Sequence, residues 1–346
     1  MRILVTGGTG FIGSHTIRAL LSAGHDVKLL VRNEEKARRL WADEPRVLED
    51  LVVGKLTSGP ATADALRECD GLIHTAAPVT LGVSRAEARQ AASDNRRSIR
   101  LLIDRALQDG MTRIVHLSTT ALFDTRGVEI ADEQTPIVQG GDPYALSKTA
   151  PELAVRALQE RGAPIAITYP PSVIGPDDPG LSEGVKGIQL FLETSVILTT
   201  SGFQIVDVRD LAAIHLALIE RDPVAPARYV TTARFMPWAE FAELLDQAAG
   251  VRLPRVRLPG KAMRFFGRLG DRLRPFMDLD PTMSAEATRL ATQWVEFDGS
   301  RVTRELGIKY RDPRASLGDT IRWLAETGQV DPRKALRFTH PGRGRR

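Results

Sequence analysis

The chain has 346 residues, of which 42% are hydrophobic and 26% are charged. These fractions are typical of a globular protein and exclude a disordered or fibrous chain. The single cysteine, Cys69, excludes an internal disulfide framework and favours a reducing compartment, so we expect a cytoplasmic protein. Met1 leads directly into a strand-like segment and no run of 18 apolar residues occurs, so we expect neither a signal peptide nor a transmembrane helix.

The formal net charge of +4 comes from the end of the chain. Six basic residues and no acidic ones lie between Arg333 and Arg346, which leaves the remainder slightly acidic. We expect 331–346 to be a basic, disordered tail, because such a terminus has too little apolar surface to bury. No aromatic-interleaved basic patch of the kind that single-strand binders use is present, so the sequence predicts no nucleic-acid partner.

Short apolar segments alternate with longer helical patterns over the first 170 residues. Each segment is almost entirely apolar, which is typical of parallel strands buried on both faces. The alternation predicts an α/β fold with a doubly wound, Rossmann-type parallel sheet. The expected strands are Arg2–Thr6, Asp26–Val31, Leu51–Val53, Gly71–His74, Arg113–Leu117 and Pro164–Tyr169, and the first helix is Phe11–Ala23.

The pattern loosens after Pro170. The segment 170–180 is rich in turn formers and is expected to be a loop that leaves the sheet. A strand at 203–208, a helix at 209–220 and a strand at 229–231 are expected to return to the first domain, so that 203–232 belongs with 1–170. The remaining segments, 171–202 and the mostly helical 233–330, predict a smaller substrate lobe.

Three glycines spaced three residues apart follow the first strand, in Thr6-Gly-Gly-Thr-Gly-Phe-Ile-Gly13. Glycine at such a turn permits a left-handed backbone, a close approach of main chain to phosphate, and tight packing of helix on strand. The start of the following helix offers unpaired N–H groups to a pyrophosphate. The alternative is a glycine-rich turn without a ligand. The motif predicts that 1–170 is a dinucleotide-binding domain.

The end of the second strand indicates which dinucleotide is bound. An NAD site usually has Asp or Glu there for the ribose 2′-hydroxyl. Here Val31 is followed by Arg32, and Lys36 comes one turn later. A guanidinium binds a 2′-phosphate in a forked geometry, whereas a carboxylate repels it. We therefore expect NADP(H) to be preferred, with NAD(H) and an ordinary surface arginine as the alternatives.

Tyr144 and Lys148 stand one helical turn apart in Tyr144-Ala-Leu-Ser-Lys148. A tyrosine with its ordinary pKa, about 10, is a slow acid or base at neutral pH. A neighbouring ammonium favours the phenolate and lowers that pKa. The pair is therefore suited to protonating a carbonyl oxygen, or to deprotonating an alcohol in reverse.

From Met1 to about Leu324 the chain resembles the extended short-chain dehydrogenase/reductases, the NAD-dependent epimerase/dehydratase family. The motifs that carry the resemblance are TGxxGxxG, YxxxK, a small-residue turn at His74-Thr-Ala-Ala77, a counterpart of RPxxVYGP at Pro170–Pro176 with Tyr169 in place of arginine, and a closing segment from Trp294 to Trp323. The resemblance implies that Lys148 also holds the nicotinamide ribose. The cofactor contacts that it implies are Gly7, Gly10, Phe11, Ile12, Gly13, Thr75, Ala76, Ala77, Lys148, Pro171, Ser172 and Val173.

The family also has a hydroxyl after the fifth strand and an asparagine in a helix. Aligned on the pattern SSxxVYG, the functional hydroxyl is Thr119, with Ser118 and Thr120 as rivals; for Thr120 we favour a purely structural role. Asn95 matches the asparagine that organises a proton relay, although a helix-surface asparagine is an equal alternative. The chain departs from the family at Lys55, where an aspartate usually faces the adenine.

Three features separate the reactions within the family. Thr120 and Ala121 replace the Asp-Glu pair of the sugar dehydratases, and Phe203 replaces the arginine that binds a nucleotide-sugar diphosphate. A contact from Arg32 to NADP suits net reduction. The resemblance therefore favours a dihydroflavonol-reductase-like oxidoreductase that interconverts a carbonyl and a secondary alcohol. The alternatives are an NAD-dependent epimerase acting on a nucleotide sugar and a hydroxysteroid-type dehydrogenase.

Two further features concern partners. A stripe at Phe266, Leu269, Leu273 and Phe276 with interleaved arginines could lie on a membrane, but we expect it to pack on the lobe beneath and to make no membrane contact. The resemblance implies a homodimer through helices of the first domain. Apolar residues that suggest an apolar small-molecule ligand, unless they are ordinary core residues, are Leu81, Leu122, Phe123, Ile188, Phe191 and Leu192.

Overall fold

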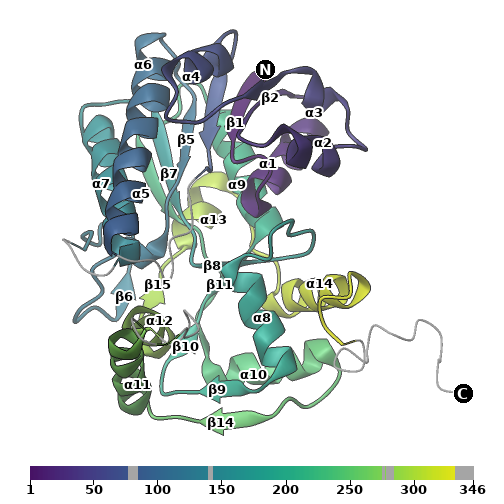
Figure 1. The fold of residues 1–346 in the computed structure, drawn as a ribbon, viewed down its shortest axis with the longest axis vertical. Helices are drawn as coiled ribbons and strands as arrows, with labels where there is room; N and C mark the ends of the chain where they lie inside the picture. Colours follow the sequence, from purple (N-terminus) through teal and green to yellow (C-terminus); the bar gives the residue numbers. More distant parts are fainter. Residues whose placement is uncertain (77–84, 139–142, 275–276, 278–283, 332–346) are drawn as a thin grey trace, which may run out of the picture.

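The computed structural model describes residues 1–76, 85–138, 143–274, 277 and 284–331. A parallel sheet with helices on both faces forms one part of the molecule, and a smaller part made of helices and short strand pairs lies against its lower edge (Figure 1). The tail at 332–346 lies outside the described residues, so its expected disorder stays a prediction. Among the described helices, none is both long and apolar enough to cross a bilayer.

The main sheet has seven strands, all paired in parallel. Its order is β12-β7-β5-β4-β1-β2-β3, so successive strands are added outward on opposite sides of the point between β1 and β4. Ligands of such sheets bind at the carboxyl ends of the strands beside this switch point. The strands are β1 Arg2–Thr6, β2 Asp26–Val31, β3 Leu51–Val53, β4 Gly71–His74, β5 Ile114–Leu117, β7 Ile165–Tyr169 and β12 Ala227–Val230. The predicted fold class is confirmed, and the six strands expected before Pro170 agree to within one residue at each end.

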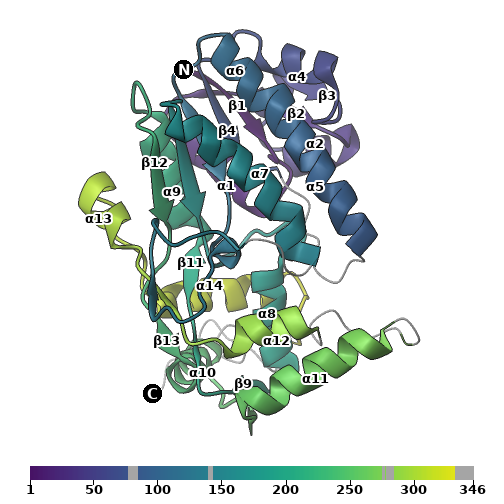
Figure 2. The ribbon, with the colours of Figure 1, turned by 90° about the vertical axis from the view of Figure 1, so that its left-hand side faces the viewer.

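Two helix layers cover the sheet, as Figure 2 shows. On one face α1 (Phe11–Ser22) packs against α9 (Val208–Ile219), and on the other α5 (Arg85–Ile99) packs against α7 (Pro143–Glu160). Each layer closes over its own apolar cluster, which gives both sheet faces a core. The remaining helices of this part are α2 Glu34–Leu40, α3 Arg46–Glu49, α4 Gly59–Leu66, the π-helix η1 Arg100–Asp104, α6 Arg105–Gln108 and the 3₁₀ turn η2 Thr120–Leu122.

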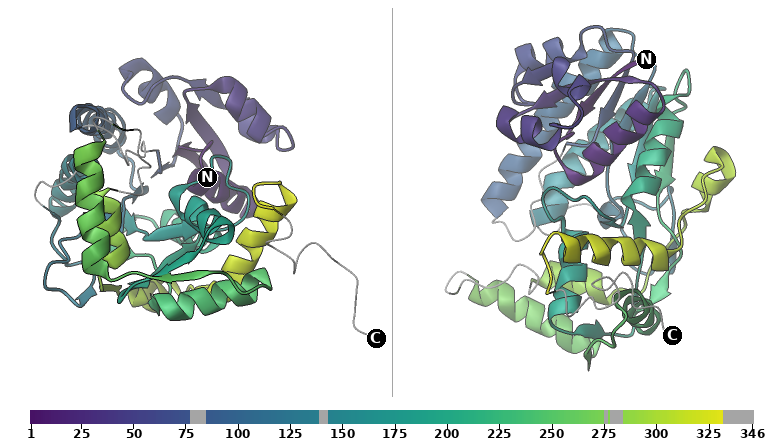
Figure 3. Two further views of the ribbon diagram at one scale, coloured as in Figure 1. Left: turned by 60° about the horizontal axis from the view of Figure 1, so that its bottom comes forward. Right: turned by 90° about the vertical axis from the view of Figure 1, so that its right-hand side faces the viewer.

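A third apolar cluster forms the core of the second part. Its helices are α8 (Glu183–Glu193), α10 (Trp238–Ala249) and α14 (Pro313–Glu326), and α14 packs on the other two and on β8 and β11 (Figure 3). The other elements are β6 Ile130–Ala131, β8 Ser172–Ile174, β9 Val196–Leu198, β10 Gly202–Phe203, β11 Ile205–Asp207, β13 Met236–Pro237, β14 Arg255–Arg257, α11 Gly260–Leu273, α12 Ala285–Thr292, β15 Glu296–Phe297 and α13 Ser300–Leu306.

Three expectations differ from the structure after Pro170. The segment expected as a loop contains β8, and the segment expected to return to the sheet as a strand forms β11 and pairs with β8 instead. The reason is that β12 already occupies the edge beside β7. The helix α13, expected in the substrate lobe, packs on α9 and β12 because Val302 is fully buried in the sheet's own core.

Candidate active site

A cavity of about 390 Å³ opens at the carboxyl ends of β1, β4 and β5. Its far wall is formed by the segment after β7, with β8, and by the first residues of α8. The cavity therefore lies at the switch point of the sheet, where the fold predicts a ligand. The lining residues are Gly7, Gly10–Gly13, His74–Ala76, Asn95, Ile99, His116–Thr119, Lys148, Pro151, Glu152, Pro170–Val173 and Ser182–Gly184.

The glycine turn forms one wall of this cavity and leaves room only for hydrogen atoms at two positions. Gly7 has a φ of +80°, and a Cβ there would lie 2.7 Å from Thr75 Oγ1 and 2.9 Å from Ala76 N. A Cβ on Gly13 would lie 2.2 Å from the carbonyl oxygen of Gly7. Gly10 precedes α1 without a side-chain cap, so the N–H groups of the first turn are available to an anion. The turn fits a pyrophosphate.

Lys148 of α7 lines the same cavity, and burial lowers the pKa of its ammonium to about 8. Tyr144 precedes it by one turn of α7, as the spacing predicted, and its side chain lies outside the described residues. Asn95 of α5 donates from Nδ2 to the carbonyl oxygen of Ser147 at 3.3 Å. This bond holds the asparagine against the turn of α7 that carries the lysine.

Thr119 and Ser118 line the cavity directly after β5, whereas Thr120 does not. The Thr119 hydroxyl caps η2 by accepting from Ala121 N at 3.2 Å, which leaves its own proton available to donate. Thr120 is buried, and its backbone N–H and hydroxyl both donate to the carbonyl oxygen of Pro170, at 3.1 and 3.5 Å. The geometry thus favours Thr119 or Ser118 for contact with a ligand and ties Thr120 to the chain after β7.

Two histidines whose side chains were given no role from the sequence also line the cavity. His74 and His116 occupy partner positions of β4 and β5, and their rings stack at 5.3 Å. His74 Nδ1 bonds with the Thr6 hydroxyl at 2.6 Å, whereas His116 Nδ1 is buried without a partner among the described residues. Burial, with repulsion from Lys148, lowers the pKa of His116 to about 3. Both rings are therefore neutral at physiological pH.

Tyr169, which stands in place of the family's arginine, takes part in a buried polar group with two residues of α7. Its hydroxyl donates to Glu152, and Arg156 Nε donates to Glu152 Oε1 at 2.8 Å and to the Tyr169 hydroxyl at 3.1 Å. The guanidinium also lies 5.3 Å from the centre of the tyrosine ring. The cation at this place is thus the Arg156 guanidinium of α7, and not an arginine at position 169 of β7.

The residues expected to bind the adenosine phosphate lie at the end of β2. Val31 pairs with Val53 of β3, so Arg32 and Lys55 follow neighbouring strand ends. The side chains of Arg32, Lys36 and Lys55 are all exposed, and none lines the cavity described above.

The residues expected to form an apolar substrate pocket do not line the cavity. Leu122 and Phe123 belong to the core beneath α5 and α7, and Ile188, Phe191 and Leu192 pack in the core of the second part. Their periodicity matches a core face as well as a pocket, and for these five the structure favours the alternative that they are ordinary core residues. Leu81 and Ala77 lie outside the described residues.

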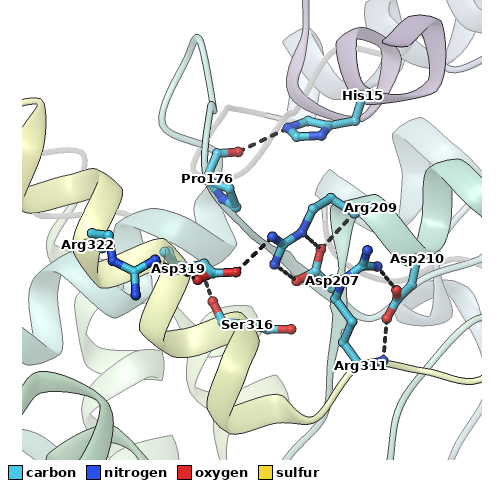
Figure 4. Close-up of polar contacts among 10 residues, drawn as sticks. His15, Pro176, Asp207, Arg209, Asp210, Arg311, Ser316, Asp319 and Arg322 are labelled. Atoms are coloured by element: carbon cyan, nitrogen blue, oxygen red, sulfur yellow. Dashed lines mark hydrogen bonds and ion pairs between the residues drawn. The ribbon is translucent and has the colours of Figure 1, made fainter. Parts of the chain in front are cut away.

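A polar network joins α14 of the second part to α9, which covers the main sheet (Figure 4). Asp207 caps α9 by accepting from Arg209 N at 2.8 Å, and the Arg209 guanidinium bonds to Asp319 of α14, also at 2.8 Å. Burial acts to raise the pKa of Asp207, but hydrogen bonds from Arg209 and Ser316 outweigh it and lower the pKa. Arg311 also pairs with the buried Asp210, but there burial outweighs the pairing and raises the pKa of the carboxyl.

The motifs and the cavity agree with a comparison of the whole chain against known families. The model of the NAD-dependent epimerase/dehydratase family matches residues 3–230. The chain belongs to this family. It is an NAD(P)-dependent enzyme acting on CH–OH groups, as the motifs predicted.

Several relatives align with this epimerase/dehydratase family member over nearly its full length. Sterol demethylase protein B of Methylococcus capsulatus is 28% identical and covers 95% of this chain and 100% of its own. A putative dihydroflavonol 4-reductase of Synechocystis is 27% identical and covers 94% of this chain and 95% of its own. Among solved structures, that of gox2253 has a TM-score of 0.77 at 28% identity over 95% of this chain and 99% of its own. The chain is thus similar to reductases and related enzymes of the family.

Proposed function

We propose that this enzyme is an NADP(H)-dependent reductase that interconverts a carbonyl and a secondary alcohol on a largely apolar small molecule. The observation that carries the proposal is the convergence of the glycine turn, Lys148 and Thr119 on one cavity. These groups match a dinucleotide and a reacting oxygen, and the cavity lies at the switch point where the fold binds ligands.

Each residue has a distinct role in this proposal. The turn from Gly7 to Gly13 binds the pyrophosphate through backbone N–H groups, and Lys148 holds the ribose hydroxyls. The bound nicotinamide supplies the hydride to the carbonyl carbon. Thr119 donates a hydrogen bond to the carbonyl oxygen and keeps it in place. Tyr144 gives its proton to that oxygen, and Asn95 positions the helix turn that carries the lysine.

We infer that the positive charge of Lys148 acts on Tyr144 in this mechanism. Among the described residues no salt bridge joins Lys148 to a carboxylate, and burial is the cause of its lowered pKa, so its charge acts on neighbouring groups. His74 and His116 are neutral and add no charge that would repel the ammonium further. Glu152, the carboxylate nearest along α7, is bonded to Arg156 and Tyr169.

A direct test of the mechanism replaces Tyr144. We expect Tyr144→Phe to lower kcat by about a thousandfold or more, because the proton donor is lost, while the dissociation constant for NADPH changes less than about threefold. Turnover and NADPH fluorescence titration measure the two quantities. Near-normal turnover by the variant would show that another group supplies the proton.

The preference for NADP rests on the cations at the ends of β2 and β3. Arg32 follows Val31, Lys55 comes two residues after its partner Val53, and no carboxylate stands at 32 or 33 to bind a 2′-hydroxyl. We expect Arg32→Asp to lower the ratio of kcat/KM for NADPH to that for NADH by about ten- to a hundredfold. Arg39→Asp, an exposed change on α2, is the matched control and should leave the ratio unchanged.

The apolar substrate rests on the names of the relatives. One is a ketoreductase of a farnesyl-bearing quinoline oxide from Stigmatella aurantiaca, 26% identical over 95% of this chain. Assays of apolar aldehydes, ketones and hydroxysteroids with NADPH and with NADH identify the class of substrate. The hydroxysteroid-type activity is one outcome of these assays.

The nucleotide-sugar epimerase is disfavoured by the surroundings of Phe203. Its ring stacks on Trp238 at 5.2 Å within the core of the second part, so this position offers no cation to a diphosphate. The enzyme could instead interconvert UDP-sugars without net use of added cofactor and be inactive on every carbonyl tested. This result would reject the reductase proposal in favour of the epimerase.

A further inference from the structure

The helix α11 packs on the rest of the molecule through its glycines. Gly260, Gly267 and Gly270 are its buried residues, and they lie on one side of the helix. A Cβ at Gly267 would lie 2.2 Å from Thr288 Oγ1 and 2.7 Å from the carbonyl oxygen of Ser284, so α12 approaches this side closely. Figure 2 shows α11 at the periphery of the second part with α12 on its inner side.

The apolar side chains of α11 consequently point away from the protein. The stripe was expected to pack on the lobe beneath, and for Phe266, Leu269 and Leu273 that expectation was wrong, because glycines occupy the contact. Phe276 lies outside the described residues. At helical spacing the exposed apolar residues form one continuous face of the kind that marks an interaction site. The exposed fractions are 62% for Phe265, 51% for Phe266, 40% for Leu269, 39% for Leu273 and 54% for Met277, just beyond the helix.

A row of positive charge flanks this apolar face. Lys261, Arg268 and Arg272 are exposed. The helix has one acidic residue, Asp271, and its carboxylate accepts from Ala285 N at 3.0 Å, on the side of α12. The outer surface of α11 is therefore apolar on one flank and positive on the other.

We propose that α11 is an interfacial helix that lays its apolar face into the surface of an anionic lipid bilayer. Phe265, Phe266 and Leu269 enter the boundary between headgroups and acyl chains, and the flanking cations contact anionic headgroups. A second copy of the chain fits less well, because apposing two such faces brings the two positive rows together without acidic partners. The proposal does not depend on the substrate or cofactor proposed above.

Flotation of the full-length protein with vesicles tests this proposal. One set contains phosphatidylcholine alone, and the other contains about one third phosphatidylglycerol. We expect partition onto the anionic vesicles to be at least about tenfold stronger and to weaken as salt is raised. Two α11 variants should each lower the anionic partition by at least about tenfold: Phe265→Ser with Leu269→Ser, and the triple change of Lys261, Arg268 and Arg272 to Glu.

Two controls separate α11 from other surfaces. Ile130→Ser with Leu190→Ser removes equally exposed apolar residues, 63% and 44%, elsewhere in the molecule and should leave partition unchanged. Changing Arg343, Arg345 and Arg346 to Glu matches the charge reversal within the basic tail. An equal loss of partition in this tail variant would assign binding to the tail and overturn the proposal.

Two further outcomes would also overturn it. The first is equal or absent binding of the unmodified protein to both vesicle types. The second is a concentration-dependent dimer that Phe265→Ser dissociates, in a protein that does not bind vesicles, since the face would then be a contact between copies. Circular dichroism of each variant verifies that it is folded.

Discussion

Lys148 has two properties that oppose each other at the scale of a single residue. In the proposed mechanism its ammonium binds the ribose hydroxyls and lowers the pKa of Tyr144, yet burial lowers the pKa of Lys148 itself to about 8. The charged form therefore predominates only below that pH in the protein without cofactor. A modest rise in pH therefore removes the positive charge of Lys148, on which the proposed site depends.

We predict that NADPH binding weakens as pH rises through about 8. The sign follows from the lowered pKa, since the lysine loses its proton above this value and with it the charge that contacts the cofactor. Fluorescence titration between about pH 7 and 9.5 measures the dissociation constant. Lys148→Met should bind weakly and without a pH step in this range. The same step in the methionine variant would assign the titration to another group.

The position of the helix α1 depends on Gly13, because α1 can approach the glycine turn closely only where a side chain is absent. We predict that Gly13→Ala raises the NADPH dissociation constant at least about tenfold, since its Cβ would lie 2.2 Å from the Gly7 carbonyl oxygen and must displace the turn. Gly187→Ala in α8 is the control, because no atom lies within 4 Å of its added Cβ. It should leave binding unchanged and stabilise the helix by up to about 1 kcal/mol. Equal affinity in both variants would contradict the role of the turn.

His215 joins three elements of the first domain. Its ring nitrogens bond with Thr16 of α1 at 3.0 Å and with Thr168 of β7 at 3.2 Å, and burial lowers its pKa to about 3. Unfolding exposes an imidazole with an ordinary pKa of 6.5, so the unfolded chain binds more protons between these values. The free energy of unfolding contributed by this residue is therefore lost as pH falls below about 6.5.

We predict that His215→Gln makes the protein less sensitive to acid. Glutamine retains a donor and an acceptor but does not titrate. The slope of the unfolding free energy against pH, measured by urea denaturation between about pH 6 and 4.5, should decrease by about 1.4 kcal/mol per pH unit. An unchanged slope would show that the imidazole is not neutral in the folded state.

The strands and the helix α11 differ in how far local sequence predicts them. Buried parallel strands are apolar throughout, so their positions follow from composition. The amphipathic pattern of α11 indicates two faces but not which one packs inward. Contact of Gly267 with Thr288 decides that orientation, and the two residues belong to different helices.

At the scale of the whole molecule, the network in Figure 4 connects the sheet with the second part. Asp207 is fully enclosed and accepts from both the backbone and the guanidinium of Arg209, whereas Asp319 is 30% exposed. A buried charge leaves unpaired donors behind when it is removed, but an exposed partner is replaced by water.

We therefore predict unequal effects for two similar substitutions. Asp207→Asn should lower the free energy of unfolding by about 3 kcal/mol, since it uncouples a buried pair and weakens the cap of α9. Asp319→Asn should lower it by about 1 kcal/mol or less. Denaturant unfolding compares the two variants. A larger loss at Asp319 would place the main connection between the two parts in α14 rather than at the start of α9.

Elements whose signals are local can be predicted from the amino-acid sequence. The apolar strands, the glycine turn and the spacing of Tyr144 and Lys148 depend on residues within a few positions of one another, so periodicity and backbone sterics suffice. Tertiary structure alone decided the pairing of β8 with β11, the stacking of His74 on His116 and the outward orientation of α11. These depend on register and packing between segments far apart in the chain, and no local pattern specifies which distant surface each segment meets.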